Sequence, residues 1–299
     1  MKALFDEFRR SLKRPEVEEY VDLYFNRPLA FLFVKAIYRT NITPNQLSVV
    51  SMLLGVSAAV CVGTGRPGLL PAAAVLLAVS IIIDCSDGQL ARLKKNGTPL
   101  GRLIDGSADY VVGIAMYTGL GLALSAGAIH PALAWLAVAA AAASNIIHST
   151  TFDHYQTRFL AVINGDTSRT VDAEIDRYAA LLEGEKSAGN NPLRRWAIGT
   201  YLRYTRFQKR ISTRGIPTSA YSPEYRDEFA RRNRKVIRMW TLLGPSTQGT
   251  LLIAAALLGR LDLFLWAMIV LRNLWGLISY AAQVHVTRRF ERDVVPSAV

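Results

Sequence analysis

The chain has 299 residues, of which 51% are hydrophobic and only 19% are charged, and this is less charge than a soluble domain of this length normally carries. Its formal net charge is +12. These values argue against an ordinary soluble protein. They make nucleic-acid binding the weaker interpretation of the charge, because basic residues of membrane proteins usually face anionic lipid headgroups.

The stretch RPLAFLFVKAIYRTNITPNQ (residues 27–46) is apolar with basic ends, and it is too short to cross a bilayer. This pattern is typical of an amphipathic helix that lies in the membrane interface. Thr43 and Pro44 suit the start of the helix that follows, since proline is favoured in the first helical turn. We therefore expect residues 1–45 to form a cytoplasmic N-terminal segment with an interfacial helix.

Six later stretches are apolar enough to span a bilayer as helices of about 20 residues. They are 46–64, 69–92, 101–126, 131–150, 240–259 and 262–284. The predicted fold is therefore an all-α integral membrane protein with six transmembrane helices. The first four fall within residues 46–150 and the last two within residues 240–284.

The basic residues predict the orientation. Residues 1–45 contain eight Lys and Arg, and residues 151–239 contain seventeen against ten Asp and Glu. The short connections near 65–68, 127–130 and 260–261 contain only two basic residues, Arg66 and Arg260. The positive-inside rule places both termini and the 151–239 segment in the cytoplasm. We expect that segment to be a basic helical insertion between spans four and five, and residues 285–299 to be a cytoplasmic tail.

Four aspartates lie at the cytoplasmic end of spans two and three, namely Asp84, Asp87, Asp105 and Asp109. Each pair has helical spacing and shares one helix face, and KKNGTP provides a turn between the pairs. Four close carboxylates would repel unless cations compensate them. Oxygen ligands suit Mg²⁺, Mn²⁺ or Ca²⁺, so this run predicts a metal site, with two Mg²⁺ or Mn²⁺ ions expected.

The intervening residues suit a phosphate ligand. Gly88 and Gly101 allow close approach of a substrate to the backbone, Ala91 keeps the same face open, and Arg92 can hold a phosphate through two hydrogen bonds. Together with the four acids they form D-x2-D-G-x2-A-R-x8-G-x3-D-x3-D. At every fixed position this run resembles the signature of the CDP-alcohol phosphotransferase family (CDP-alcohol phosphatidyltransferases).

The resemblance implies an enzyme that transfers a phosphoalcohol group, often phosphatidyl, from a CDP-linked lipid donor to an alcohol acceptor and releases CMP. By analogy the four aspartates would bind the metals, and Asp109 would also be the general base on the acceptor hydroxyl. The residues expected to line the CDP pocket are Gly88, Ala91, Arg92, Gly101, Asn45 and Ser48. The resemblance also implies a homodimer, because members of this family form homodimers. We therefore expect a homodimer in contact with membrane lipids.

The acceptor site is less specified. Arg272 lies in the middle of span six, where an arginine usually faces a cavity or an acid. It is expected either to contact the acceptor or a phosphate, or to pair with an aspartate of the motif. His148, Asp153 and Arg158 follow span four and are further candidates for acceptor contacts. Inositol phosphate, glycerol phosphate, serine and a lipid alcohol all stay open as acceptors, with an inositol-phosphate-like one preferred.

Two other functions are compatible with intramembrane acids. A divalent-cation transporter or channel would use the four aspartates as a permeation site, but such proteins more often show inverted repeats, and this sequence has none that we recognise. A scaffold that has lost catalysis is the other, and the intact acids argue against it.

Overall fold

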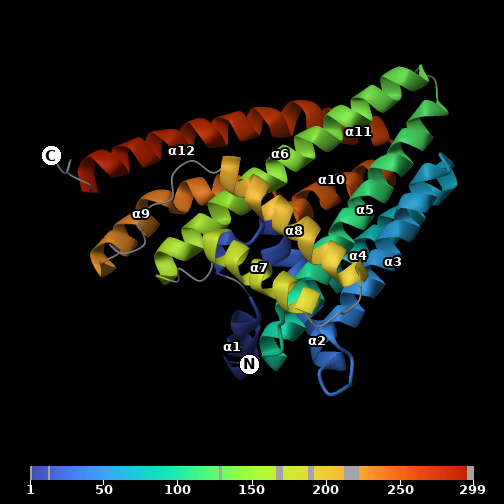
Figure 1. The fold of residues 1–299 in the computed structure, drawn as a ribbon. Coiled ribbons are helices and arrows are strands. Elements are labelled where there is room, and N and C mark those ends of the chain that lie inside the picture. The colour runs from blue at the N-terminus through green and yellow to red at the C-terminus, as the bar shows by residue number, and fades with distance from the viewer. Residues whose placement is uncertain are drawn as a thin grey trace. The chain divides into compact units, whose positions relative to one another are not determined.

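The computed structural model of the chain describes residues 2–12, 14–127, 130–165, 171–187, 192–211 and 222–294. Every regular element in these ranges is helical, and none is a strand (Figure 1). The predicted all-α class is therefore confirmed. The helices form two compact units, Met1–Ser149 with Thr241–Gly276 and Thr150–Trp240 with Leu277–Val299.

Short helices open the first unit. They are α1 (Lys2–Ser11), η1 (Pro15–Val17), η2 (Asp22–Asn26) and α2 (Arg27–Ile37). One face of α2 buries Ala30, Phe31 and Val34. Val34 packs with Leu47 and Leu90, from two of the longer helices that follow. The stretch expected to lie in the interface thus forms a helix with one buried face.

Among the residues that the structure describes, five helical segments are long and apolar enough to cross a membrane. They are Pro44–Gly63, Pro67–Lys94, Leu103–Ser125, Pro131–Asn164 and Leu261–Asp293. They contain α3 (Pro44–Gly63), η3 (Pro67–Leu69), α4 (Leu70–Lys94), α5 (Pro99–Ser125), α6 (Pro131–Asn164), α11 (Leu261–Trp266), η7 (Ala267–Leu271) and α12 (Arg272–Val294). Five of the six expected spans therefore have a counterpart.

The stretch 240–259 differs from the single helix that hydropathy predicts. A 3₁₀ turn, η6 (Thr241–Leu243), precedes α10 (Pro245–Leu257), which has only 13 residues. A helix of that length measures about 20 Å, and the hydrocarbon core is about 30 Å thick. Pro245 explains the break, because a proline has no amide hydrogen and is favoured in the first turn of a helix.

The predicted start of α3 is confirmed. Thr43 caps the helix, with its hydroxyl accepting from the Gln46 amide at 3.3 Å while the Gln46 side chain accepts from the Thr43 amide at 2.9 Å. This reciprocal pair satisfies two amides that a helix start otherwise leaves unpaired. It holds Asn45 and Ser48 at the beginning of α3.

α3 packs against both α4 and α5 (Figure 1). A Cβ added to Gly119 would lie 2.5 Å from the Ala59 carbonyl oxygen, so α3 and α5 approach at backbone distance. Gly121 is similarly covered by Trp135 of α6. Gly119 and Gly121 of α5 therefore allow close packing against α3 and α6 within the chain.

The second unit contains part of α6, α7 (Val171–Ser187), α8 (Pro192–Ile211), α9 (Pro223–Trp240) and most of α12. Tyr178 of α7 and Tyr201 of α8 pack with ring centroids 4.5 Å apart. The described residues of the 151–239 segment are therefore predominantly helical.

Candidate metal and nucleotide site

The turn between α4 and α5 begins with a left-handed residue and ends with a helix cap. Lys95, directly after α4, has a φ of +54°. Thr98 precedes α5, and its hydroxyl accepts a hydrogen bond from the Gly101 amide at 2.9 Å. A threonine in this position commonly caps a helix, so the turn defines where α5 starts and where its first carboxylate lies.

Three of the four predicted acids meet. Asp84 and Asp87 from α4 and Asp105 from α5 each offer an oxygen within 4.8 Å of the other two. Asp87 is buried and the other two are half-buried. Asp109, one turn beyond Asp105, is exposed and is not part of this group. The three clustered acids are called the carboxylate triad below.

The triad is compatible with a divalent cation. Three carboxylates held this closely repel one another unless a cation or protons compensate their charge, and oxygen donors are those that Mg²⁺ and Mn²⁺ prefer. Burial makes the repulsion stronger, because less water screens it. The donor set and its placement thus fit the metal predicted from the sequence.

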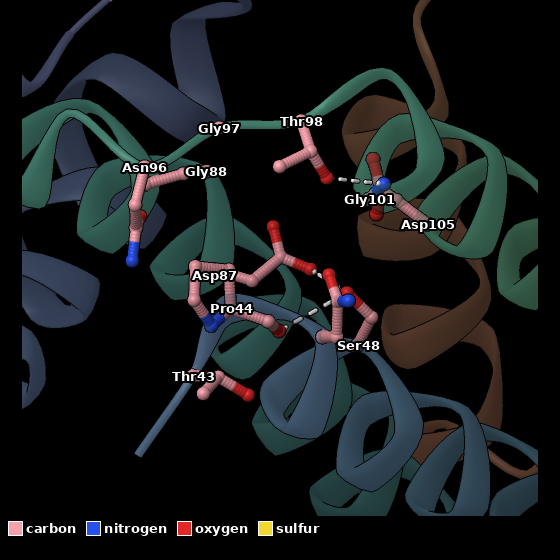
Figure 2. A pocket seen from close by; sticks show the side chains of 12 residues that line it. Thr43, Pro44, Ser48, Asp87, Gly88, Asn96, Gly97, Thr98, Gly101 and Asp105 are labelled. Atoms are coloured by element: carbon pink, nitrogen blue, oxygen red, sulfur yellow. Dashed lines mark hydrogen bonds between the residues drawn. The ribbon is translucent and has the colours of Figure 1, made fainter. Parts of the chain in front are cut away.

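Ser48, one of the residues predicted to line the pocket, contacts the triad directly. Its hydroxyl donates a short hydrogen bond to Asp87 Oδ2 (Figure 2). Ser48 is 2% exposed, and its hydroxyl also lies 3.3 Å from the Pro44 carbonyl oxygen. In this structure Ser48 therefore orients an acid of the triad.

A cavity of about 260 Å³ lies beside the triad. Its lining comes from the start of α3, from α4 and from the turn into α5 (Figure 2). The lining residues are Thr43, Pro44, Asn45, Ser48, Asp87, Gly88, Ala91, Asn96, Gly97, Thr98, Gly101 and Asp105. Five of the six residues predicted to line a CDP pocket are among them, and Arg92 is not.

The sequence interpretation missed five lining residues, Thr43, Pro44, Asn96, Gly97 and Thr98. It used Thr43 only as a helix start and Asn96–Gly97 only as a turn. A threonine before Pro99 is a signal for a helix cap, and such a cap in the turn of the motif was the available indication that Thr98 would face the cavity.

Gly101 is required by close packing. A Cβ at this position would lie 3.0 Å from Asn45 Oδ1 and 3.2 Å from Thr98 Oγ1. At Gly88, an added Cβ would lie 3.4 Å from the guanidinium nitrogens of Arg92. Both glycines therefore let polar side chains come close to the backbone that lines the cavity.

Arg92 lies next to Gly88. Its Nε donates to the Ser11 carbonyl oxygen at 2.5 Å, while Nη2 is buried without a hydrogen-bond partner in the described part of the chain. An unpaired buried donor is unfavourable. Arg92 thus has one unsatisfied donor beside a residue that lines the cavity.

Two of the predicted acceptor residues, Arg272 and His148, belong to the first unit. Arg272 is 4% exposed, and its Nη2 donates to the carbonyl oxygens of Leu243 at 2.6 Å and Gly244 at 3.4 Å. The expectation that it pairs with an aspartate of the motif does not match these contacts. His148 Nε2 lies 3.0 Å from Asn273 Oδ1. Asp153 and Arg158 belong to the second unit.

The sequence profile of the CDP-alcohol phosphatidyltransferase family matches residues 41–166. Those residues are a CDP-alcohol phosphatidyltransferase domain. The domain contains α3, α4 and α5 with the carboxylate triad and the cavity beside it. Together with the long apolar helices, this domain identifies the chain as an integral membrane protein.

A curated protein of Thermococcus kodakarensis, named bifunctional IPC transferase and DIPP synthase, is 33% identical to the chain over 108 residues. The aligned residues are 35% of this chain and 24% of that protein. The chain thus spans about a quarter of the length of this relative. α1, η1, η2 and α2 all lie before the CDP-alcohol phosphatidyltransferase domain.

Proposed function

We propose that the chain is a metal-dependent membrane transferase, which moves a phosphoalcohol group from a CDP-linked donor to an alcohol acceptor and releases CMP. The observation that carries this proposal is the carboxylate triad beside the 260 Å³ cavity. The relative's name, which includes a transferase and a synthase, supports the same class of chemistry. Phospholipid biosynthesis is the process in which such a reaction belongs.

The triad would hold the metal, with Mg²⁺ or Mn²⁺ as the proposed ions and two as the proposed number. When bound, these cations neutralise negative charge on a diphosphate and make CMP a better leaving group. Asp87 is kept in place for this role by the Ser48 hydroxyl. Asp109 remains a proposed further ligand, although it lies outside the triad.

The nucleotide would occupy the cavity. Gly88, Ala91 and Gly101 leave room for the donor along the backbone, and Asn45 offers an amide at the same wall. Arg92 would direct its unpaired Nη2 to the diphosphate, because a guanidinium group binds phosphate oxygens strongly.

In the proposed reaction Asp109 takes the proton from the acceptor hydroxyl. The acceptor oxygen then bonds to the phosphorus that carries the alcohol group, and the bond from that phosphorus to the CMP oxygen breaks. Because Asp109 is exposed, it can pass the proton on to water. A positioned general base of this kind contributes about 10²- to 10⁴-fold to a rate.

The acceptor proposed first is an inositol-phosphate-like alcohol. Arg272 and His148 are the proposed acceptor contacts in the first unit, since the Nε and Nη1 of Arg272 and the Nδ1 of His148 are buried without partners in the described residues. Asp153 and Arg158 remain acceptor candidates on the sequence pattern alone.

The topology is part of the proposal. We infer six spans, with the interrupted stretch 240–259 that contains η6 and α10 as the fifth, an interfacial α2, and both termini and the site in the cytoplasm. The concentration of basic residues in the connections assigned to the cytoplasm supports this orientation. The segments 1–45, 46–150, 151–239, 240–284 and 285–299 keep the boundaries predicted from the sequence. A homodimer in the membrane completes the arrangement.

One assay tests the function. The purified chain is incubated in lipid nanodiscs with Mn²⁺, a CDP-linked lipid and a panel of alcohols, and CMP is measured. CMP release that stops with EDTA supports the proposal. A transporter would instead move Mn²⁺ across liposomes without CMP release, and a scaffold would do neither. Either of those results would remove the transferase assignment.

A further inference from the structure

Polar residues of the N-terminal segment are buried against the helix that carries the motif. Glu18, Asp22, Asn26 and Arg27 are each no more than 9% exposed. They precede the CDP-alcohol phosphatidyltransferase domain, which begins at residue 41. Burial of four polar side chains costs free energy unless each is paired, so their partners show what this burial achieves.

Arg27 contacts both ends of one turn of α4. Its Nη1 donates to the Cys85 carbonyl oxygen at 3.2 Å, and its own carbonyl oxygen accepts from Gln89 Nε2 at 3.1 Å. Cys85 and Gln89 are four residues apart and therefore lie on one face of the helix. Gln89 is 0% exposed, so no solvent competes for this bond.

Two acids of the triad lie in or directly beside that turn. Asp84 directly precedes Cys85, and Asp87 lies midway between Cys85 and Gln89. Side chains two residues apart do not share a helix face. Arg27 therefore contacts a different face of the turn from the one that carries the Asp87 side chain. Asp87 lies with Asp84 and Asp105 and lines the cavity.

Glu18 keeps the Arg27 side chain in this position. Arg27 Nε lies 3.4 Å from Glu18 Oε2, and the two side chains are 10% and 3% exposed. Breaking one partner of a buried ion pair is strongly destabilising, so the guanidinium group has little freedom to leave. The N-terminal segment thus presents a fixed, two-sided contact to the turn.

We propose that Arg27 is a positioning residue for the metal site: it holds the Cys85–Gln89 turn so that Asp84 and Asp87 converge with Asp105. This inference rests on the proposed function, because it assumes that the triad binds a divalent cation. It assigns to the segment before the domain a part in building the site. Residues that orient metal ligands typically change metal affinity when they are replaced.

The test is a Mn²⁺ titration of the full chain in nanodiscs, with free Mn²⁺ measured by electron paramagnetic resonance and folding by thermal unfolding. Arg27→Lys keeps the charge but has one nitrogen in place of three, and Arg27→Gln removes the charge. Both variants should weaken Mn²⁺ binding by about tenfold or more. Arg260→Lys, at an exposed arginine paired with Asp262, should leave it unchanged.

The sign of the effect separates positioning from charge. If Arg27 acted only as a nearby positive charge, its removal would attract the cation, and Arg27→Gln would bind Mn²⁺ more tightly. Tighter or unchanged binding in a folded Arg27→Gln protein overturns the proposal. Should both arginine variants unfold, Gln89→Met decides, because it removes the second contact and leaves the Arg27–Glu18 pair intact. Unchanged affinity in that variant also overturns it.

The same titration distinguishes failure of the proposed metal site from failure of the inference about Arg27. If the parental chain binds no Mn²⁺, or if Asp87→Asn binds it as well as the parental chain does, both the metal site and this inference fail. If Asp87→Asn loses Mn²⁺ while the folded Arg27 variants keep it, only the inference fails.

Discussion

Thr247 donates both its amide and its side-chain hydroxyl to one oxygen of the Glu19 carboxylate, each at 2.7 Å. The Ser246 amide donates to the other oxygen at 3.1 Å. Glu19 thus pairs the first free amides of α10, where the helix dipole also favours a negative charge. The N-terminal segment holds a helix that begins more than 220 residues later.

Arg272 pairs the backbone groups on the other side of the interruption at Pro245. It donates to the carbonyl oxygens of Leu243 and Gly244, which precede Pro245. A carboxylate on the amides and a guanidinium group on the carbonyls satisfy the backbone groups that a broken helix leaves unpaired. The break at Pro245 is therefore a paired feature of the first unit.

Glu19 predicts a pH dependence of stability. Burial, and then the nearby Asp22 carboxylate, raise the pKa of Glu19 from 4.5 to about 7. Because the folded state binds this proton more tightly than the unfolded state does, the Glu19 contribution to stability falls as the pH rises from about 4.5 to about 7. The shift to about 7 corresponds to roughly 3 kcal/mol of unfolding free energy.

The measurement is thermal unfolding in detergent between pH 4.5 and 7.5. Glu19→Gln should flatten the slope in this window. Glu7→Gln, which changes a more exposed carboxylate bonded to Lys35, is the matched control and should keep the slope. An unchanged slope in Glu19→Gln would show that another group titrates.

The features of the site that depend on residues close in the sequence were predictable. The helical spacing of Asp84, Asp87 and Asp105 predicted a cluster, and the structure places their oxygens within 4.8 Å. The cap at Thr43 was predictable because its partner is Gln46. In both cases the geometry follows from a few residues of regular helix.

Long-range partners and the fifth span were not predictable in this way. Nothing in the local pattern of Glu19 or Arg27 indicates that their partners lie 228 and 58 residues away. Hydropathy averaged over 240–259 hides the effect of Pro245, which interrupts the backbone without lowering the apolar content. Asp109 has the correct spacing, but only the structure shows that it lies outside the triad.

Asp109→Asn should separate metal binding from catalysis. Asp109 is exposed and outside the triad, so the variant should fold and still bind Mn²⁺ at the triad. If Asp109 is the general base, CMP release should fall by about 10²- to 10⁴-fold. Asp87→Asn is the contrasting variant, since it should lose Mn²⁺ binding as well. Turnover retained in Asp109→Asn would remove its role as base.

Ser48→Ala should weaken metal binding. Without the hydroxyl, Asp87 loses the hydrogen bond that orients it, and the Mn²⁺ dissociation constant should rise by about tenfold. Ser48→Thr keeps a hydroxyl and should recover part of the affinity. Ser57→Ala is the matched control, because Ser57 is exposed on the same helix and its hydroxyl donates to the Leu53 carbonyl oxygen, away from the triad. Equal dissociation constants for Ser48→Ala and Ser57→Ala would contradict the prediction.

Gly101→Ala should impair the nucleotide pocket and spare the metal. The added Cβ would lie 3.0 Å from Asn45 Oδ1 and 3.2 Å from Thr98 Oγ1, so the cavity wall must shift by a few tenths of an ångström. Displacement of groups that position a substrate is costly, and we expect the KM for the CDP-linked donor to rise about tenfold. Mn²⁺ affinity should stay the same, since the triad is not displaced. Gly106→Ala, on the same helix with nothing within 4 Å of the added atom, should leave both quantities unchanged. A KM increase of equal size in the two variants would mean that the effect comes from helix α5 and not from the cavity.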